Sequence, residues 1–167
     1  MRPIKLLVVL WLTSFSLLAS PVSELQLIGQ AKLKVWFWDV YESALYSQNG
    51  VYQAGDYPQA LSITYLRDIK SADLINATRE QWQRQGLWSE QAQDWLDQLT
   101  AIWPDIRRGD TLVLKVSQEG VSHFYFNNAA IGQIEPPAFA NAFLAIWLSN
   151  DTEYPELRAQ LTGENTP

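Results

Sequence analysis

The sequence contains no cysteine and a single histidine, His123, in 167 residues. Without cysteine the chain can form neither disulfides nor thiolate metal sites, and no lipid-carrying cysteine can follow its N-terminal segment. One histidine excludes clusters of imidazole ligands, so we expect no metal. A Ser-His-Asp triad would have to use His123, but no Gly-x-Ser-x-Gly motif is present. No phosphate-binding or dinucleotide glycine motif is present either, so we expect no cofactor.

Basic residues are also scarce, at 12 against 18 acidic residues. Two of them, Arg2 and Lys5, precede the apolar run 6–18, and small residues follow at Ala19-Ser20. This is the pattern of a secretory signal peptide, and the run is shorter than the roughly 20 residues of a membrane span. We therefore predict a periplasmic protein with a signal peptide at residues 1–20, whose cleavage site stays open, and no stable membrane insertion after processing.

The rest of the chain has the size of one domain, which we place at residues 21–162, with a polar tail at 163–167. Its acidic excess argues against nucleic acid as a partner and against adsorption to anionic lipid. The oligomeric state stays open.

The segment Gly29–Tyr46, GQAKLKVWFWDVYESALY, is unusually apolar. With strand periodicity, Trp36, Trp38 and Val40 point to one face, and Phe37 and Tyr41 point to the other. A sheet with one face in water alternates apolar and polar residues, but this strand is apolar on both faces. Packed helices, a partner or an apolar ligand must therefore cover each side.

The order of predicted elements indicates the fold class. Strands are expected at 25–28, 32–37, 38–47 and 60–65, then two helices at 71–85 and 89–103, a strand meander at 111–117, 122–126 and 130–134, and helices at 138–149 and 154–161. This order predicts an α+β protein with a large, mostly antiparallel sheet and a layer of α-helices on one face.

Two charged residues stand out within apolar surroundings. Asp39 lies in the aromatic strand, where it is either in water at a bulge or buried with a raised pKa or a partner. Arg67 follows the strand ALSITYL and either pairs with Asp68 or a carbonyl, or points into a pocket to hold an anion.

Four blocks of the chain resemble bacterial chalcone isomerase-like proteins, in the same order. They are Gly29–Tyr46, Tyr57–Ile69 (YPQALSITYLRDI), Ile102–Leu112 (IWPDIRRGDTL) and Phe124–Ser149, which contains FYFNNAAIGQI and PAFANAFLAIWLS. The resemblance implies an open-faced β-sandwich with a ligand cleft between the sheet and the helices. It also implies one of three activities, because the superfamily contains chalcone-closing enzymes, fatty-acid-binding proteins and non-catalytic members.

The enzymes and the fatty-acid-binding members use an arginine from the early strands, by similarity. This chain has no arginine between Arg2 and Arg67, and the nearest matches to the fatty-acid grip are Lys32 and Tyr41. Fixed donors are needed to stabilise an oxyanion, so the missing arginine favours a non-catalytic protein.

The leading hypothesis is an exported, non-catalytic protein that binds a small apolar or fatty-acid-like ligand in the sheet–helix cleft. The alternatives are a chalcone isomerase-type intramolecular lyase and an envelope protein that binds a partner. The candidate ligand-binding residues supply apolar walls and a polar end: Lys32, Trp36, Trp38, Tyr41, Arg67, Phe139, Phe143 and Trp147.

Overall fold

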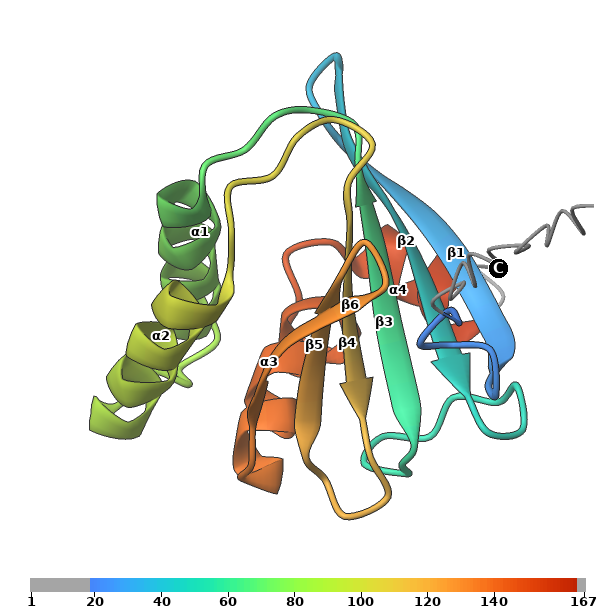
Figure 1. Ribbon diagram of the computed structural model, residues 1–167. Coiled ribbons are helices and arrows are strands. Elements are labelled where there is room, and N and C mark those ends of the chain that lie inside the picture. The colour runs from blue at the N-terminus through green and yellow to red at the C-terminus, as the bar shows by residue number, and fades with distance from the viewer. Residues whose placement is uncertain (1–18, 165–167) are drawn as a thin grey trace, which may run out of the picture.

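The computed structural model describes residues 19–164, so the apolar run of the predicted signal peptide lies outside the described residues. These residues form a six-stranded antiparallel sheet, in which every strand pairs with its neighbour in the sequence, and four helices (Figure 1). The strands are β1 (Gln26–Val35), β2 (Trp38–Ser47), β3 (Gln59–Tyr65), β4 (Thr111–Val116), β5 (Ser122–Phe126) and β6 (Ala129–Ile134). The helices are α1 (Ser71–Arg84), α2 (Glu90–Ile102), α3 (Pro137–Leu148) and α4 (Pro155–Thr162). The predicted α+β architecture is confirmed.

The aromatic segment Gly29–Tyr46 is a hairpin, so its predicted division into two strands after residue 37 is close to the observed one, whereas its interpretation as one strand with two apolar faces is wrong. Val35 pairs with Trp38, so Trp36 and Phe37 form a two-residue turn between β1 and β2. The register shifts where Leu33 pairs with Tyr41 and Lys34 with Asp39. The expectation that both faces are covered is wrong at the turn, because Trp36, Phe37 and Trp38 are 86, 88 and 59% exposed.

One face of the sheet carries the core. Alternate residues of the central strands, such as Leu61, Ile63, Leu112, Leu114 and Phe124, pack against the helices in a single hydrophobic cluster. Strong alternation therefore predicts the buried face of β3 and β4 correctly.

The helices begin and end close to their predicted positions. The Ser89 hydroxyl caps α2 by accepting a hydrogen bond from the Ala92 N–H at 3.1 Å. Helix α3 is apolar nearly all round and is buried on several sides, as its composition predicts. None of the helices in residues 19–164 is long and apolar enough to cross a membrane.

Gly29 follows a bulge inside a continuous β1, because the register with β2 shifts between Leu27 and Gly29. A side chain there would overlap the carbonyl oxygen of Gln160 in α4, so glycine allows α4 to pack directly on β1. Leu157 and Leu161 of α4 belong to the hydrophobic core.

Candidate ligand-binding cavity

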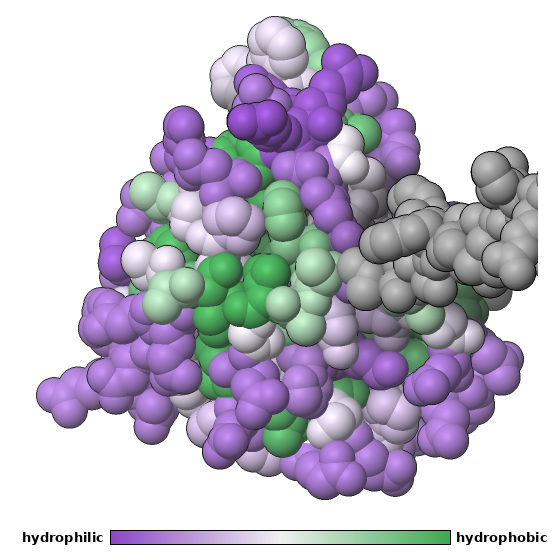
Figure 2. All heavy atoms as spheres, in the orientation of Figure 1, coloured by the Kyte–Doolittle hydropathy of each residue, from purple (hydrophilic) through white to green (hydrophobic). Residues whose placement is uncertain are grey.

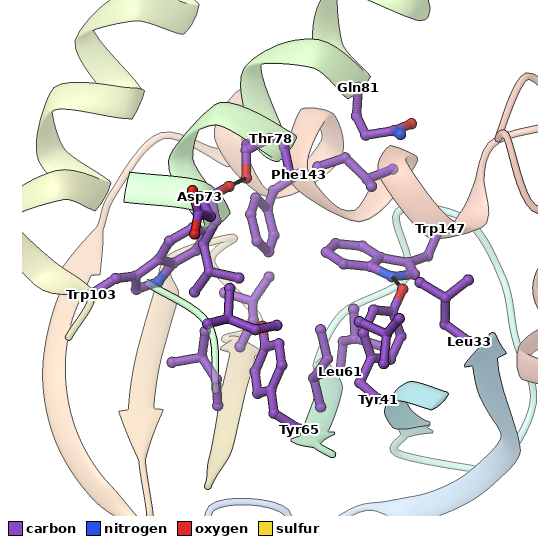
Figure 3. Close-up of a pocket in the computed structure, with 18 of the residues that line it drawn as sticks. Leu33, Tyr41, Leu61, Tyr65, Asp73, Thr78, Gln81, Trp103, Phe143 and Trp147 are labelled. Atoms are coloured by element: carbon purple, nitrogen blue, oxygen red, sulfur yellow. Dashed lines mark hydrogen bonds between the residues drawn. The ribbon is translucent and has the colours of Figure 1, made fainter. Parts of the chain in front are cut away.

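A cavity of about 330 Å³ lies between the core face of the sheet and helices α1 and α3 (Figure 3). Its walls are mainly aliphatic and aromatic side chains from five strands and both helices. Among them, Leu61 and Leu114 come from the sheet, Leu74 from α1, and Phe143 and Trp147 from α3. Cavities of this size and composition are typical of small-molecule sites.

The side of the cavity next to β1 is held by a buried hydrogen bond. The indole N–H of Trp147 donates to the Tyr41 hydroxyl at 2.8 Å, and both residues are 8% exposed. Burial raises the pKa of Tyr41 well above its usual value of 10.0, so this hydroxyl is neutral at physiological pH. The bond fixes the indole of Trp147 as a rigid wall (Figure 3).

Two further hydrogen-bonding groups line the cavity. Tyr65 is 5% exposed, its ring meets that of Tyr41 edge-on at 6.1 Å, and burial raises its pKa as well. The indole N–H of Trp103 is buried and has no hydrogen-bond partner among the described residues. An unpartnered donor in a cavity wall is costly unless something bonds to it, so Trp103 Nε1 is a candidate contact for a ligand oxygen.

The rim of the cavity lies along α1. Asp73 is exposed there, and Gln81 donates through Nε2 to Glu153 at 2.6 Å while its Oε1 has no partner among the described residues. Within the described lining, the hydrogen-bond donors are uncharged and the one charged side chain is the acidic Asp73. The cavity therefore matches an uncharged polar group better than a carboxylate.

Three of the predicted ligand-binding residues, Tyr41, Phe143 and Trp147, line the cavity together. Phe139 is fully buried beside it, stacked on Phe143 with ring centroids 5.5 Å apart. It supports the cavity wall from behind.

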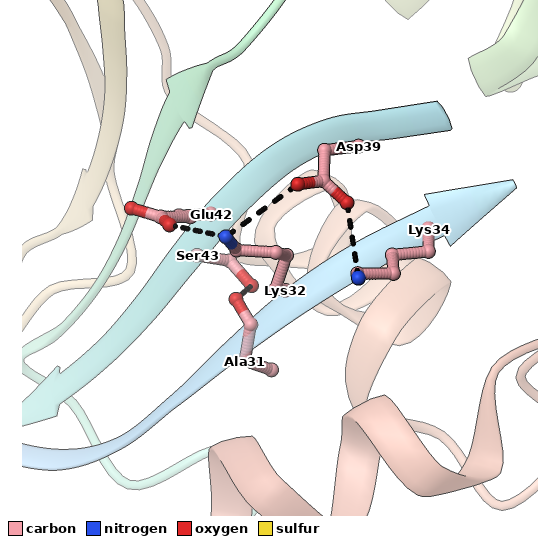
Figure 4. A network of polar contacts seen from close by, with 6 residues as sticks. All are labelled: Ala31, Lys32, Lys34, Asp39, Glu42 and Ser43. Carbon is pink, nitrogen blue, oxygen red and sulfur yellow. Dashed lines mark hydrogen bonds and ion pairs between the residues drawn. The ribbon is translucent and has the colours of Figure 1, made fainter. Parts of the chain in front are cut away.

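Lys32 lies on the other side of the sheet. Its neighbours Ala31 and Leu33 are buried, so Lys32 points away from the helices, and its ammonium group is 2.9 Å from Glu42 and 3.7 Å from Asp39 (Figure 4). The hydrogen bond and charge of Glu42 raise the pKa of Lys32. Lys32 does not line the cavity, and two carboxylates already compensate its charge.

Asp39 is partly exposed and lies 3.4 Å from Lys34 as well as near Lys32. It is therefore paired with cations at a bulge and is not a buried catalytic carboxylate. This outcome combines two of the expectations for Asp39, a bulge position and a charged partner.

The remaining predicted site residues gather at the β1–β2 turn, outside the cavity. Trp36 and Trp38 are exposed, and the guanidinium carbon of Arg67 lies 4.8 Å from the centroid of the Trp38 ring. Asp68 accepts a hydrogen bond from the Arg108 backbone N–H at 2.8 Å. Arg67 therefore stacks on an aromatic ring, where a partner carboxylate or an anion pocket had been expected.

Several lining residues were not predicted, notably Tyr65, Trp103 and the α1 side chains Leu74, Ala77 and Thr78. The alternation of ALSITY places Tyr65 on the face of Leu61 and Ile63 and could have identified it. Trp103 carries no such signal, because it follows α2 in an irregular segment. Within residues 19–164, no three His, Asp or Glu side chains come close enough to hold a metal ion.

The fold and the cavity together define an α+β protein whose helix layer encloses an apolar cleft on one face of an antiparallel sheet. The family model described as chalcone isomerase-like matches residues 18–163. The chain therefore belongs to the chalcone isomerase-like family.

Two similar proteins extend this finding. An uncharacterized protein of Haemophilus influenzae is 29% identical over 161 residues, which cover 96% of this chain and 78% of that protein. The crystal structure of a fatty-acid binding protein of Arabidopsis thaliana superposes with a TM-score of 0.66 at 13% identity, covering 86% of this chain and 89% of that one. At this identity the likeness shows a shared fold.

Proposed function

We propose that this protein is an exported, non-catalytic binding protein that holds one small apolar, acyl-type ligand in the cavity between the sheet and helices α1 and α3. The observation that carries the proposal is the apolar cavity itself, of about 330 Å³. The fatty-acid-binding protein that shares the fold supports an acyl ligand.

The apolar walls would supply most of the affinity. Each CH₂ group removed from water contributes roughly 0.8 kcal/mol. A dozen such groups contribute roughly 10 kcal/mol, so after an association cost of at least about 4 kcal/mol the affinity reaches about −6 kcal/mol, which is a Kd of tens of micromolar.

The polar groups of the cavity define the ligand's head. Trp103 Nε1 and the hydroxyl of Tyr65 are neutral donors, whereas an ionised carboxylate buried beside them would have no cation to compensate it within the described lining. The ligand is therefore an alcohol, an ester or a protonated acid. Fatty acids should bind more weakly as the pH rises through the pKa of their own carboxyl group.

A fluorescence titration tests this proposal. Straight-chain alcohols, methyl esters and fatty acids of matched length should change tryptophan emission saturably, with affinity rising with chain length. Trp103→Phe removes the N–H that would bond to the ligand's polar group. It should raise the Kd of the alcohol by roughly two- to ten-fold, the value of one neutral hydrogen bond.

Trp95→Phe is the matched control, because the Trp95 N–H is also buried without a partner among the described residues but does not line the cavity. It should leave affinity unchanged. If no acyl compound gives a saturable change while the protein is folded, the binding proposal is wrong. Equal losses of affinity in both variants would refute only the hydrogen bond from Trp103 and would leave the binding proposal in place.

Export and catalysis need separate measurements. The mature protein should begin between Ser20 and Glu24 and fractionate with the periplasm, and recovery of chains that begin at Met1 in washed membranes would contradict export. Chalcone ring closure, followed by absorbance at several pH values, should not exceed the rate in buffer. Turnover that disappears in Arg67→Ala would establish the lyase alternative instead.

A further inference from the structure

The β1–β2 turn forms an exposed aromatic tip, which we define as residues 35–38. Val35, Trp36, Phe37 and Trp38 are 40, 86, 88 and 59% exposed. The turn projects beyond the loops around it at the top of Figure 1. In the same orientation, pale and green spheres stand above a band of purple ones in Figure 2. The tip is convex, apolar at its end and polar below.

Turn geometry does not require aromatic residues here. Two-residue hairpin turns favour glycine, asparagine or aspartate, because one or both residues adopt a positive φ. The β5–β6 turn of this chain follows that rule, with Asn127 and Asn128 at φ 47° and 69°. The aromatic tip instead places Trp36 at φ 59°, which is unfavourable for a bulky side chain. Turn geometry therefore does not account for the aromatic residues, and their side chains are largely exposed on the folded chain.

The surroundings of the tip carry a different charge from the rest of the protein. Two loops, 66–70 and 104–110, lie next to the strands of the tip. The Leu66 N–H donates a hydrogen bond to the Val40 carbonyl of β2 at 2.9 Å, and a β-bridge between Ile69 and Ile106 joins the two loops. Residues 35–38, 66–70 and 104–110 hold four of the ten basic residues in 19–164 and three of the eighteen acidic ones. The four are Arg67, Lys70, Arg107 and Arg108. The remainder of the described chain is strongly acidic.

We propose that the aromatic tip docks this protein onto the surface of a lipid bilayer. Tryptophan and phenylalanine side chains partition into the interface between headgroups and acyl chains, and basic side chains just behind them reach the phosphates. The Arg67 guanidinium, stacked on Trp38 at 4.8 Å, already has this arrangement. The near-neutral charge around the tip lets it approach a membrane, while the acidic body stays turned away.

A bilayer fits this surface better than a protein partner does. A protruding turn of three adjacent aromatic side chains needs a deep complementary groove on a protein, whereas a membrane interface accepts it without preformed shape. Leu33 and Val40, which flank the tip on β1 and β2, also line the cavity. Docking would therefore bring the cavity close to a source of apolar ligand.

The absence of cysteine makes a local test possible. Phe37→Cys carries a single environment-sensitive fluorophore at the tip. Val51→Cys carries the same fluorophore on an equally apolar, 63% exposed position in the β2–β3 loop, at the opposite end of the strands (Figure 1). Each labelled protein is titrated with vesicles of phosphatidylcholine and of phosphatidylcholine mixed with phosphatidylglycerol.

Docking predicts a blue shift at residue 37 with either vesicle and none at residue 51. Adding Trp36→Ser and Trp38→Ser should raise the lipid concentration needed for half the shift by roughly ten-fold or more, while the urea midpoint stays unchanged. No shift at residue 37, or equal shifts at both positions, would overturn the proposal. A shift that appears without vesicles and grows with protein concentration would assign the tip to a second copy of this chain and would overturn it too. Neither result depends on whether the cavity binds a ligand.

Discussion

Replacing Tyr41 by phenylalanine tests the buried hydrogen bond that holds the cavity wall. The substitution removes only the hydroxyl, which accepts the Trp147 N–H at 2.8 Å. Both side chains are 8% exposed, so the indole N–H would remain buried with no acceptor. A buried donor left unsatisfied costs about 1–3 kcal/mol. We therefore expect the free energy of unfolding to fall by that amount, with a decrease in Tm of about 2–4 °C for each kcal/mol.

Urea denaturation followed by far-UV circular dichroism measures this change. Tyr46→Phe is the matched control, because Tyr46 lies on the same strand but on the face away from the cavity, by the alternation of β2. The control should change stability little. The reasoning fails if Tyr41→Phe costs no more than Tyr46→Phe.

Three further predictions concern pH, packing and the outer face of the sheet. Burial raises the pKa of Tyr65 above its usual 10.0, so its contribution to stability is fully present below pH 10 and is lost as the pH rises above that value. Above pH 10, the unfolding free energy of the wild type should fall more steeply than that of Tyr65→Phe, by up to about 1.4 kcal/mol per pH unit. Parallel curves in alkaline urea titrations would contradict this. Gly29→Ala should lower the urea midpoint more than Gly132→Ala, because the first new methyl group meets the Gln160 backbone and the second meets only a flexible isoleucine side chain; the reverse order would refute the close packing of α4. Lys32→Ala should leave acyl-ligand affinity unchanged in the fluorescence titration, because Lys32 faces away from the cavity. A loss of affinity for fatty acids but not for alcohols would show that Lys32 contacts the ligand.

Much of the fold could be predicted from the sequence because local patterns and the global fold agree. The alternation of ALSITY identifies the buried face of β3, and Ser89 with the apolar spacing after it identifies α2. The start of β2 at Trp38 was predicted, but Trp36 and Phe37 were not recognised as a turn because they are neither glycine, asparagine nor aspartate. Both are aromatic residues with strand propensity, so periodicity alone assigns them to the first strand, which in the structure ends at Val35.

The candidate cavity could be predicted only in part. Tyr41, Phe143 and Trp147 were identified because they are aromatic residues on elements expected to be buried. A cationic end of the cleft was expected at two residues. Lys32 was suggested by the family resemblance, and Arg67 by its position directly after the apolar strand ALSITYL. Lys32 alternates with the buried Ala31 and Leu33 and therefore lies on the outer face, whereas the resemblance that suggested it carried no information about the face.

Native mass spectrometry of the protein incubated with a straight-chain alcohol, its methyl ester and the fatty acid of the same length, at neutral pH, tests the central claim most directly. The account predicts one ligand per chain, with the alcohol and the ester retained in preference to the ionised acid, and weaker retention of the alcohol in Trp103→Phe but not in Trp95→Phe. A folded protein that retains none of the three, or that selects the fatty-acid anion, would contradict a cavity built for an uncharged apolar ligand.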